Sequence, residues 1–434
     1  MMDQILNVPK LSGVVRVPSS KSEAHRALIV AALSCLYGAG VESHRIYCTD
    51  SNEDIDATVR CLVALGAGIR RDGAYITVKP ITDIPSVATL DCGESGSTLR
   101  FLLPVVCALG TLRNGDMAVS LEGHGRLPER PLSPLYEELV AHGATLSCAE
   151  LTPLVVSGGI RGGAYQISGS VSSQFISGLL FALPLLTENS TLTVTGRAES
   201  VPYIDMTLDA ISSVTGAIRG ALPTWHITGQ NAKKATLALP VLTVSGDWSG
   251  AAFFLAAGVM GEADKSVTVT GLSADTRQGD SAIVDVLRRM GGHITASGND
   301  FTAHGSALHG CEIDAAQIPD LVPILAVVAS VCEGETRITG ASRLRLKESD
   351  RLATVSAMIT ALGGDIQETD DGLCIRGVPA LRGGVVDAAG DHRIAMSAAI
   401  AATRCLESVT VTGAEAVAKS YPAFWDDLNS LTMQ

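Results

Sequence analysis

The sequence predicts an α/β protein built from six repeats, each holding two helices and a few strands. Three observations predict this architecture: glycine turns that end one series of helices, polar turns that open a second series, and a repeat length that both series share. The repeat is about 72 residues, because 434 residues divided by six give 72.3. Since a single core stops growing well below this chain length, we expect two domains with three repeats each.

Apolar helical patterns end in a small-residue turn five times, at LVALGA, LVAHGA, SSVTGA, LRRMGG and ITALGG. The first glycines of these turns are Gly66, Gly143, Gly216, Gly291 and Gly363. Successive glycines are 77, 73, 75 and 72 residues apart. Glycine suits the end of a helix because it adopts the left-handed conformation that closes the last turn. The residues that follow predict a strand, a turn and a second strand.

Hydroxyl- or glycine-rich turns open the second series of apolar helices. Their marker residues are Lys21, Ser97, Ser173, Ser249, Asp320 and Arg393. The steps between markers are 76, 76, 76, 71 and 73 residues, so we expect each repeat to have the order βαβαββ. If the repeats pack these helices in parallel, their N-termini gather at one end of each domain. The positive ends of the helix dipoles then favour anions there.

The composition excludes several classes of protein. A net charge of −13 argues against a general binder of nucleic acid or of membrane surfaces. The ten cysteines are dispersed without a CxxC pair, so we expect buried free thiols in a reducing compartment. The opening residues MMDQILNVPK lack the apolar core of a signal peptide, and no apolar stretch approaches the ~20 residues of a membrane span. We therefore expect a soluble, cytoplasmic protein.

Cationic and hydroxyl side chains concentrate at the predicted helix starts, although acidic residues outnumber basic ones 45 to 32. The motifs SSKSEAHR, GESGSTLR, GHGRLPERP and SVSSQF supply Lys21, Ser22, Arg26, Gly96, Arg100, Arg126, Arg130, Ser172, Ser173 and Gln174. The motifs RLRLKESDR, GDHRIAM and AKSYP supply Arg343, Arg345, Lys347, Glu348, Asp350, Arg351, Asp391, His392, Arg393 and Lys419.

Each cluster alone also has a purely structural explanation. Ser172 and Ser173 suit helix caps, Arg126 suits a solvated loop, KESDR suits ion pairs on a helix, and His392 suits a hydrogen-bonded core histidine. SSKS does not match GxxxxGK[ST], which excludes a P-loop. Together the clusters indicate more than one anionic group, because arginine holds phosphate or carboxylate through two hydrogen bonds and one phosphate does not need so many cations.

The motifs SKSEAHRA, GESGSTLR, GHGRLPERP, SVSSQF, PYIDMTL, IPD, KESDRL, GDHRIAM and AKSYPAFW stand in the order seen in the 5-enolpyruvylshikimate-3-phosphate synthase family. The chain resembles that family from Leu11 to about Leu428. The resemblance implies a two-domain inside-out α/β barrel of six βαβαββ repeats, with ligands in the interdomain cleft. It implies a discontinuous domain of residues 1–19 and 243–434 and an inserted domain of residues 20–242. We expect a monomer, because that cleft lies within one chain.

The resemblance also implies the reaction. The enolpyruvyl group of phosphoenolpyruvate would pass to the 5-hydroxyl of shikimate 3-phosphate by addition and elimination, releasing phosphate. Neither a metal nor an organic cofactor is implied. Cationic neighbours would hold the charge that develops on the phosphate.

Site residues carry over by motif. The resemblance implies that shikimate 3-phosphate is bound by Lys21, Ser22, Arg26, Ser172, Ser173, Gln174, Ser200 and Asp320. It implies that phosphoenolpyruvate is bound by Gly96, Arg126, Arg351, Arg393 and Lys419, with Lys21 and Gln174 reaching both ligands. Lys347 also counts among the substrate-binding residues. The implied acid/base pair is Asp320, ranked as base, and Glu348, ranked as acid, with Lys21 and His392 as accessory groups.

Four positions depart from the family pattern. Arg343 stands where many members have an asparagine that touches the shikimate moiety, and Ser19 stands where the family often has glycine. Glu94 and Ser95 replace the usual Asn-Ala. Glu94 brings a negative charge toward the predicted phosphoenolpyruvate site, so we expect it to alter the affinity for anionic inhibitors such as glyphosate.

Two alternative functions remain open on the sequence. The first is the sister enolpyruvyl transferase that acts on UDP-N-acetylglucosamine, which usually carries a catalytic cysteine where this chain has GHGRLPERP. The second is a non-catalytic anion-binding repeat protein, which would be expected to lose acid/base groups such as Lys21, Asp320 and Glu348. Turnover with each acceptor distinguishes the three.

Overall fold

The structure is a computed structural model that describes residues 2–7, 10–149, 153–230 and 241–432. The chain divides into two compact units. One, here called the split unit, combines Met1–Ser20 with Ser245–Gln434, and the other, the inserted unit, is Lys21–Val244. The bounds expected from the sequence lie at 19/20 and 242/243, and those of the compact units lie at 20/21 and 244/245.

The inserted unit contains three four-stranded sheets and six α-helices within its described residues. The sheets have the strand orders β14-β3-β5-β4, β6-β7-β9-β8 and β10-β11-β13-β12. The strands are β3 (His44–Tyr47), β4 (Gly68–Asp72), β5 (Tyr75–Lys79), β6 (Val87–Asp91), β7 (Ala118–Glu122), β8 (Ala144–Leu146), β9 (Leu154–Gly158), β10 (Ala164–Ser168), β11 (Ser190–Thr195), β12 (Ile218–Ala221), β13 (Thr224–Ile227) and β14 (Val241–Thr243). The helices are α1 (Lys21–Leu33), α2 (Glu53–Ala64), α3 (Gly96–Leu112), α4 (Leu135–Ala141), α5 (Ser173–Ala182) and α6 (Val201–Ser212).

The split unit repeats this plan. Its sheets have the strand orders β16-β17-β15-β2, β18-β19-β21-β20 and β1-β23-β22. The strands are β1 (Asp3–Leu6), β2 (Gly13–Arg16), β15 (Ser266–Thr270), β16 (His293–Ser297), β17 (Asp300–His304), β18 (Glu312–Asp314), β19 (Glu335–Thr339), β20 (Asp365–Thr369), β21 (Gly372–Arg376), β22 (Gly384–Asp387) and β23 (Val409–Thr412). The helices are α7 (Trp248–Met260), α8 (Ile283–Arg289), α9 (Val322–Ala329), α10 (Arg351–Ala361), α11 (His392–Ala401) and α12 (Phe424–Thr432).

Each sheet joins a parallel pair of strands to an antiparallel partner, as β18, β19 and β21 do. In two sheets the leading parallel strand comes from a distant part of the chain: β14 pairs with β3, and β2 pairs with β15. In the sixth sheet, β1 from the N-terminus lies antiparallel to β23. The six small sheets confirm the predicted α/β class and its sixfold repetition.

The two places where the chain leaves and re-enters the split unit lie next to each other. Ser19 and Gly246 form an antiparallel bridge, and the Ser20 N–H donates to the Ser245 carbonyl at 2.7 Å. The buried Gln278 amide holds the second of these segments by donating to Ser245 Oγ at 3.0 Å and to the Gly246 carbonyl at 2.9 Å.

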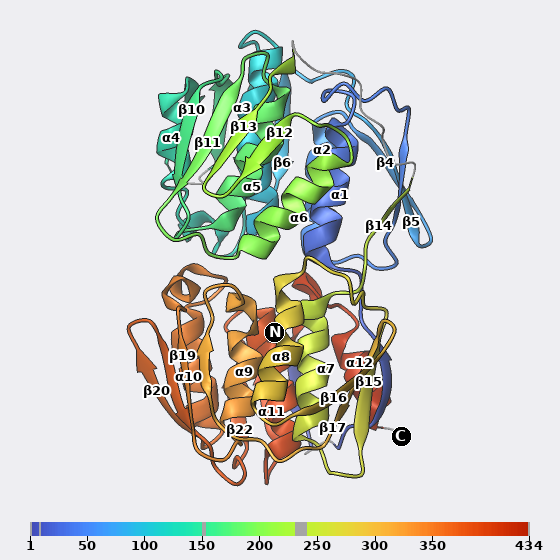
Figure 1. Cartoon of the computed structure of the whole chain (residues 1–434), viewed down its shortest axis with the longest axis vertical. Helices are drawn as coiled ribbons and strands as arrows, with labels where there is room; N and C mark the ends of the chain where they lie inside the picture. Colours follow the sequence, from blue (N-terminus) through green and yellow to red (C-terminus); the bar gives the residue numbers. More distant parts are fainter. Residues whose placement is uncertain (1, 8–9, 150–152, 231–240, 433–434) are drawn as a thin grey trace. The chain divides into compact units, whose positions relative to one another are not determined.

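Helices that open the repeats are buried on almost every side, as their apolar sequences require. In the split unit, α7, α9 and α11 lie inside with strands around them (Figure 1). Each unit has a separate apolar core, which contains Phe253, Leu325 and Ile394 in the split unit and Leu28, Phe101 and Leu179 in the inserted unit.

The predicted helix starts are confirmed. α1 begins at Lys21 and α5 at Ser173, and the other four markers lie within two residues of the start of α3, α7, α9 or α11. Polar side chains cap several of them, because the first N–H groups of a helix lack partners within the helix. Ser95 caps α3, Ser172 caps α5, and Asp391 caps α11.

Four of the five glycine turns have the predicted left-handed backbone. The φ angles are 104° at Gly66, 109° at Gly143, 91° at Gly291 and 83° at Gly363. The prediction is wrong for Gly216, whose φ lies outside the left-handed region. α6 already ends at Ser212, and the next N–H groups donate to carbonyls of its last turn, so Gly216 lies beyond the cap.

All ten cysteines are free thiols, and six of them are buried. The expectation of burial is wrong for Cys35, Cys148, Cys311 and Cys374, which are partly exposed. The first three lie in turns or loops, and Cys374 lies on strand β21. Over the described part of the chain, no helix is both long and apolar enough to cross a membrane.

Candidate active site

Lys21 opens α1 and meets the start of the neighbouring helix. Its Nζ lies 2.8 Å from Oδ2 of Asp54, which belongs to the first turn of α2. The two side chains are 17% and 13% exposed, so the pair is accessible at the end of these helices. This position, with a cation and a carboxylate side by side, suits proton transfer or the binding of a polar ligand.

Arg26 lies one turn further into α1 and is buried. Its guanidinium donates to Thr207 Oγ1 at 2.8 Å, to the Ser22 carbonyl at 2.7 Å and to the Tyr203 carbonyl at 2.8 Å. Burial lowers the pKa of Arg26 to about 10, although Tyr203 opposes this shift. Arg26 therefore fastens α1 to α6.

A buried chain of hydrogen bonds connects the starts of α1, α2 and α3. His25 Nδ1 lies 2.6 Å from Thr58 Oγ1, Thr58 lies 2.7 Å from Thr98 Oγ1, and the Thr98 hydroxyl donates to Ser95 Oγ at 2.8 Å. Burial holds the pKa of His25 well below its usual value, and Lys21 and Arg26 add to the effect. The sequence interpretation missed this chain, because isolated threonines on apolar helices give no distinctive signal.

The starts of α3 and α5 also meet. Gln174 accepts from Arg100 Nη1 at 2.9 Å and donates to Ser97 Oγ at 2.8 Å. The Ser172 hydroxyl accepts from the Gln174 N–H at 3.3 Å, and Ser173 beside it is 8% exposed. The predicted SVSSQF residues therefore lie directly beside the predicted GESGSTLR residues.

Gly96 allows two arginines to approach the backbone closely. A Cβ atom added at Gly96 would lie 2.6 Å from Arg130 Nη1 and 3.1 Å from Arg100 Nη1. Gly96, Arg100 and Arg130 thus form one cationic group at the start of α3, where the helix dipole adds positive potential. The sequence motifs named Arg100 and Arg130 as candidate anion-binding residues, but the family resemblance assigned neither of them to a ligand.

The loop GHGRLPERP lies against this group. The His124 N–H donates to the Gly93 carbonyl at 2.8 Å, and the Glu94 carboxylate packs on Gly125, where an added Cβ would overlap it. Arg126 is half-exposed, and its Nε lies 3.3 Å from Glu129 Oε2. Arg126 can therefore move toward a ligand at little cost, since exposed ion pairs contribute about 1 kcal/mol or less.

Ser200 and Ala389 have left-handed backbones although neither is glycine. Their φ angles are 53° and 51°. Ser200 precedes α6 and is buried, and Ala389 precedes α11 by three residues. Such conformations cost on the order of 1 kcal/mol and gather at functional sites.

Asp320 is the centre of a charged cluster in the split unit. Its carboxylate lies 2.8 Å from Arg351 Nη1, 3.4 Å from Lys347 Nζ and 3.2 Å from Arg393 Nη2. Burial alone would raise the pKa of Asp320, but Arg393, Lys347 and Arg351 together hold it well below its usual range. Asp320 is therefore an ionised hydrogen-bond acceptor at neutral pH.

Arg351 joins three carboxylates at the start of α10. Besides Asp320, its guanidinium lies 2.6 Å from Glu348 Oε2 and 2.7 Å from Asp391 Oδ2. The arginine and Asp391 are buried, whereas Asp320 and Glu348 are 21% and 20% exposed. One guanidinium thus holds two accessible carboxylates, and each can serve as a proton acceptor or donor for a ligand within hydrogen-bond reach.

Lys347 is a cation of this cluster whose charge changes with pH in the mildly alkaline range. Burial lowers its pKa to about 8, although Asp320 pulls in the opposite direction. Its side chain remains 24% exposed, so it can reach a ligand. Arg343, the residue that departs from the family pattern, donates to the Ala316 carbonyl at 2.9 Å.

The turn before α11 completes the cluster. Asp391 accepts from the Arg393 N–H at 3.0 Å, and His392 is buried beside it. Lys419 Nζ donates to the Gly390 carbonyl at 2.7 Å, which connects the AKSYP motif to the GDHR motif. Six predicted residues of the split unit therefore form one group of ion pairs: Asp320, Lys347, Glu348, Arg351, Asp391 and Arg393.

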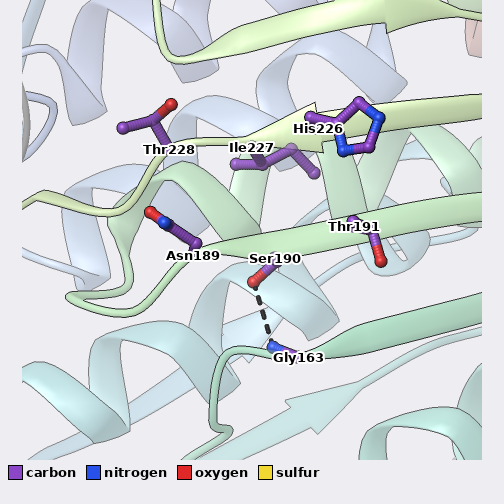
Figure 2. A pocket seen from close by; sticks show the side chains of 7 residues that line it. All are labelled: Gly163, Asn189, Ser190, Thr191, His226, Ile227 and Thr228. Atoms are coloured by element: carbon purple, nitrogen blue, oxygen red, sulfur yellow. Dashed lines mark hydrogen bonds between the residues drawn. The ribbon is translucent and has the colours of Figure 1, made fainter.

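A separate cavity of about 270 Å³ lies at the edge of the β10-β11-β13 sheet (Figure 2). Its lining includes Asn189, Thr191 and His226, and none of the predicted site residues borders it. Within the described residues, no group of three or more His, Cys, Asp or Glu side chains is placed to hold a metal ion.

Comparison with known proteins identifies relatives of the whole chain. Residues 6–428 match the family model described as EPSP synthase (3-phosphoshikimate 1-carboxyvinyltransferase). The 3-phosphoshikimate 1-carboxyvinyltransferase of Clostridium acetobutylicum is 41% identical over 428 residues, covering 97% of this chain and 95% of the relative. The enzyme of the same name from Clostridium perfringens is 41% identical over 437 residues, covering 99% and 98%.

Two solved structures share the fold. The EPSP synthase of Acinetobacter baumannii superimposes with a TM-score of 0.78 at 24% identity, covering 99% of this chain and 98% of that one. The enolpyruvyl transferase NikO of Streptomyces tendae superimposes with a TM-score of 0.77 at 20% identity, covering 99% and 97%. At these identities the two structures support the architecture alone.

Proposed function

Because the chain belongs to the EPSP synthase family, we propose that it transfers the enolpyruvyl group of phosphoenolpyruvate to the 5-hydroxyl of shikimate 3-phosphate. The products are 5-enolpyruvylshikimate 3-phosphate and phosphate. The observation that carries this proposal is the Arg351 cluster, in which Asp320 and Glu348 lie on one buried guanidinium with Lys347 and Arg393 beside them.

The proposed binding residues follow the motifs. Shikimate 3-phosphate is held by Lys21, Ser22, Arg26, Ser172, Ser173, Gln174, Ser200 and Asp320, and phosphoenolpyruvate by Gly96, Arg126, Arg351, Arg393 and Lys419. The cationic group around Gly96 supports an anionic ligand at the start of α3. The geometry adds Arg100 and Arg130 to the proposed phosphoenolpyruvate residues, because both guanidiniums lie at the Gly96 backbone.

The proposed reaction has two steps. In the addition, the 5-hydroxyl oxygen bonds to C2 of phosphoenolpyruvate while the hydroxyl proton leaves and a proton reaches C3, giving a tetrahedral adduct. In the elimination, C3 loses a proton, the C2–O bond to phosphate breaks and the enol ether forms. Asp320 accepts from the hydroxyl, and Glu348 exchanges the C3 proton, with Lys21 and His392 as accessory groups.

The cations around these carboxylates support the second step. As the C2–O bond breaks, negative charge develops on the departing phosphate, and fixed guanidinium groups stabilise it without reorganisation. The reaction needs proton transfer and charge stabilisation only, so the proposal includes no cofactor. We also propose that the enzyme is a monomer and that it lies in the cytoplasm.

The test is phosphate release from phosphoenolpyruvate with shikimate 3-phosphate, with UDP-N-acetylglucosamine and with no acceptor. We expect release with shikimate 3-phosphate alone and its loss in Lys21→Ala. Lys10→Ala is the matched control, because Lys10 pairs with Glu262 at the surface and is 74% exposed. Release with the nucleotide sugar alone would assign the chain to the sister activity, and tight binding of shikimate 3-phosphate without release would make it a binding protein.

A further inference from the structure

The repeats place a recurring contact at the start of their helices. A residue at or just before the start of one helix meets a charged residue about 32 positions later, near the start of the next helix. Lys21 meets Asp54 at 2.8 Å, and Asp320 meets Arg351 at 2.8 Å. The separations are 33 and 31 residues, and each contact lies at the helix starts of its own unit.

The fourth repeat makes the same contact with a residue that the sequence interpretation did not name. Ser249, the marker of this repeat, donates its hydroxyl to Asp280 Oδ2 across a separation of 31 residues. Asp280 lies in the short 3₁₀ turn Gly279–Ala282 immediately before α8. Asp280 is therefore the counterpart of Asp54 and Arg351, but its partner is an uncharged hydroxyl.

Asp280 is buried, and no cation among the described residues forms an ion pair with it. It is 1% exposed, and its Oδ1 has no hydrogen-bond partner among the residues that the structure describes. Burying an ionised carboxylate costs free energy unless charges or hydrogen bonds compensate it. A proton on Oδ1 removes the charge and lowers this cost, so the geometry favours the neutral acid.

The charges acting on Asp280 come from the packed elements around it. Asp247 caps α7, Asp320 lies before α9, and Arg393 lies in α11. Burial raises the pKa of Asp280 to about 6, Asp320 and Asp247 raise it further, and Arg393 and the Ser249 hydroxyl oppose them. With this pKa, Asp280 changes its charge between about pH 5 and pH 7.

The protonation state of Asp280 changes the net charge around Asp320 and Arg351. Asp320, Glu348 and Asp391 supply three negative charges, and Lys347, Arg351 and Arg393 supply three positive ones. These six charges balance one another. An ionised Asp280 adds one negative charge near Asp320 and Arg393, which weakens the attraction of the cluster for anions.

We propose that Asp280 is a positioning residue that acts through Asp320 and Arg393, setting the affinity of the candidate active site for anionic substrates by gaining or losing a proton. This inference rests on the proposed function for its substrates. The neutral form favours phosphoenolpyruvate, and the ionised form weakens its binding.

Asp280→Asn tests the inference, because it mimics the neutral acid at every pH. The KM for phosphoenolpyruvate is measured for both proteins from pH 5 to pH 8, and the ratio of the wild-type KM to the variant KM removes the ionisation of the substrate itself. We expect a ratio near one at pH 5 that rises to about threefold or more at pH 7.5, with a midpoint near 6. The matched control is Asp285→Asn in α8, an exposed carboxylate whose ratio stays flat.

Ser249→Ala provides a second variant. The hydroxyl stabilises the ionised form of Asp280, so its removal moves the midpoint of the KM dependence to higher pH. A merely structural role for Asp280 would change stability or kcat equally at all pH values. A flat ratio for Asp280→Asn, or an unmoved midpoint for Ser249→Ala, would overturn the proposal.

A readout that does not need turnover separates this inference from the proposed function. Because the ionised carboxyl is disfavoured in the fold, the Tm of Asp280→Asn should rise relative to wild type as the pH increases from about 4 to about 6. Stabilisation of each protein by inorganic phosphate is then compared at pH 5 and at pH 7. A phosphate effect that weakens with pH in wild type alone supports the inference even if the acceptor is wrong, and equal phosphate effects contradict it.

Discussion

Arg351 Nε and Asp391 Oδ2 lie 2.7 Å apart, and the two side chains are 1% and 0% exposed. The pair connects the start of α10 to the cap of α11, forty positions later in the chain. Ser349 Oγ adds a hydrogen bond to Asp391 at 3.0 Å. The two accessible carboxylates of the cluster, Asp320 and Glu348, are therefore supported by an ion pair that water does not reach.

Removing the Arg351 guanidinium should strongly reduce both stability and turnover. Arg351→Met leaves Asp391 buried without its cation, so we expect a loss of about 3–5 kcal/mol in the free energy of unfolding and loss of turnover. Urea unfolding and phosphate release measure the two effects. The control is Arg345→Met, whose partners Glu368 and Asp350 are about one-third exposed, and which should cost about 1 kcal/mol or less. Equal losses in the two variants would contradict the assignment.

Asp320 should make the protein sensitive to acid. Its pKa in the fold lies well below the value of an unfolded aspartate, so its stabilising contribution is complete above about pH 5. The contribution disappears as the pH falls through the folded pKa. Asp320→Asn should therefore flatten the decline in unfolding free energy between pH 5 and pH 3. Asp285→Asn, with an exposed carboxylate, should leave the decline as it is in wild type.

Lys347 should limit activity at alkaline pH. Its pKa of about 8 means that it loses its positive charge between about pH 7 and pH 9. The cluster then becomes more negative, so the KM for phosphoenolpyruvate should rise several-fold over this range. Lys347→Arg keeps its charge and should move the rise to higher pH. An identical profile in the variant would show that another group titrates.

Gly96 should be needed for ligand binding more than for folding. A methyl group in Gly96→Ala would displace the Arg130 guanidinium, whose nearest atom would lie at 2.6 Å. Because the far end of an arginine can move, we expect a change in Tm of about 4 °C or less and a KM for phosphoenolpyruvate at least about tenfold higher. Gly40→Ala is the control, since an added Cβ there meets nothing within 4 Å. An unchanged KM would remove Gly96 from the site.

The helix starts were predictable because each is encoded locally. Ser95, Ser172 and Asp391 are capping residues, and an apolar helical pattern follows each of them directly. The cap and the apolar pattern together mark the start of the helix. The failure at Gly216 is also local, because a helix end depends on where its last carbonyls find donors and not on glycine alone.

The contacts within the site were not predictable from the motifs. Lys21 and Asp54 lie 33 positions apart, and Arg351 and Asp391 lie 40 apart, so only the packing of the helices brings them together. The His25–Thr58–Thr98 chain had no signal, because buried hydroxyls look like ordinary core residues in a sequence. Asp280 was missed because it lies outside the polar turns that mark the repeats, in the short turn before α8.

The bridge between Ser19 and Gly246 has a consequence for how such a chain can arise and be engineered. The split unit leaves its own fold and returns to it at two backbone positions already joined by hydrogen bonds, so the interruption costs it almost no loop entropy. In its topology, the inserted unit Lys21–Val244 is a domain insertion between Ser20 and Ser245 of the split unit. A direct peptide link from Ser20 to Ser245 should give a shorter chain in which the split unit folds alone. The inserted unit, expressed separately, should fold with β14 as its last strand.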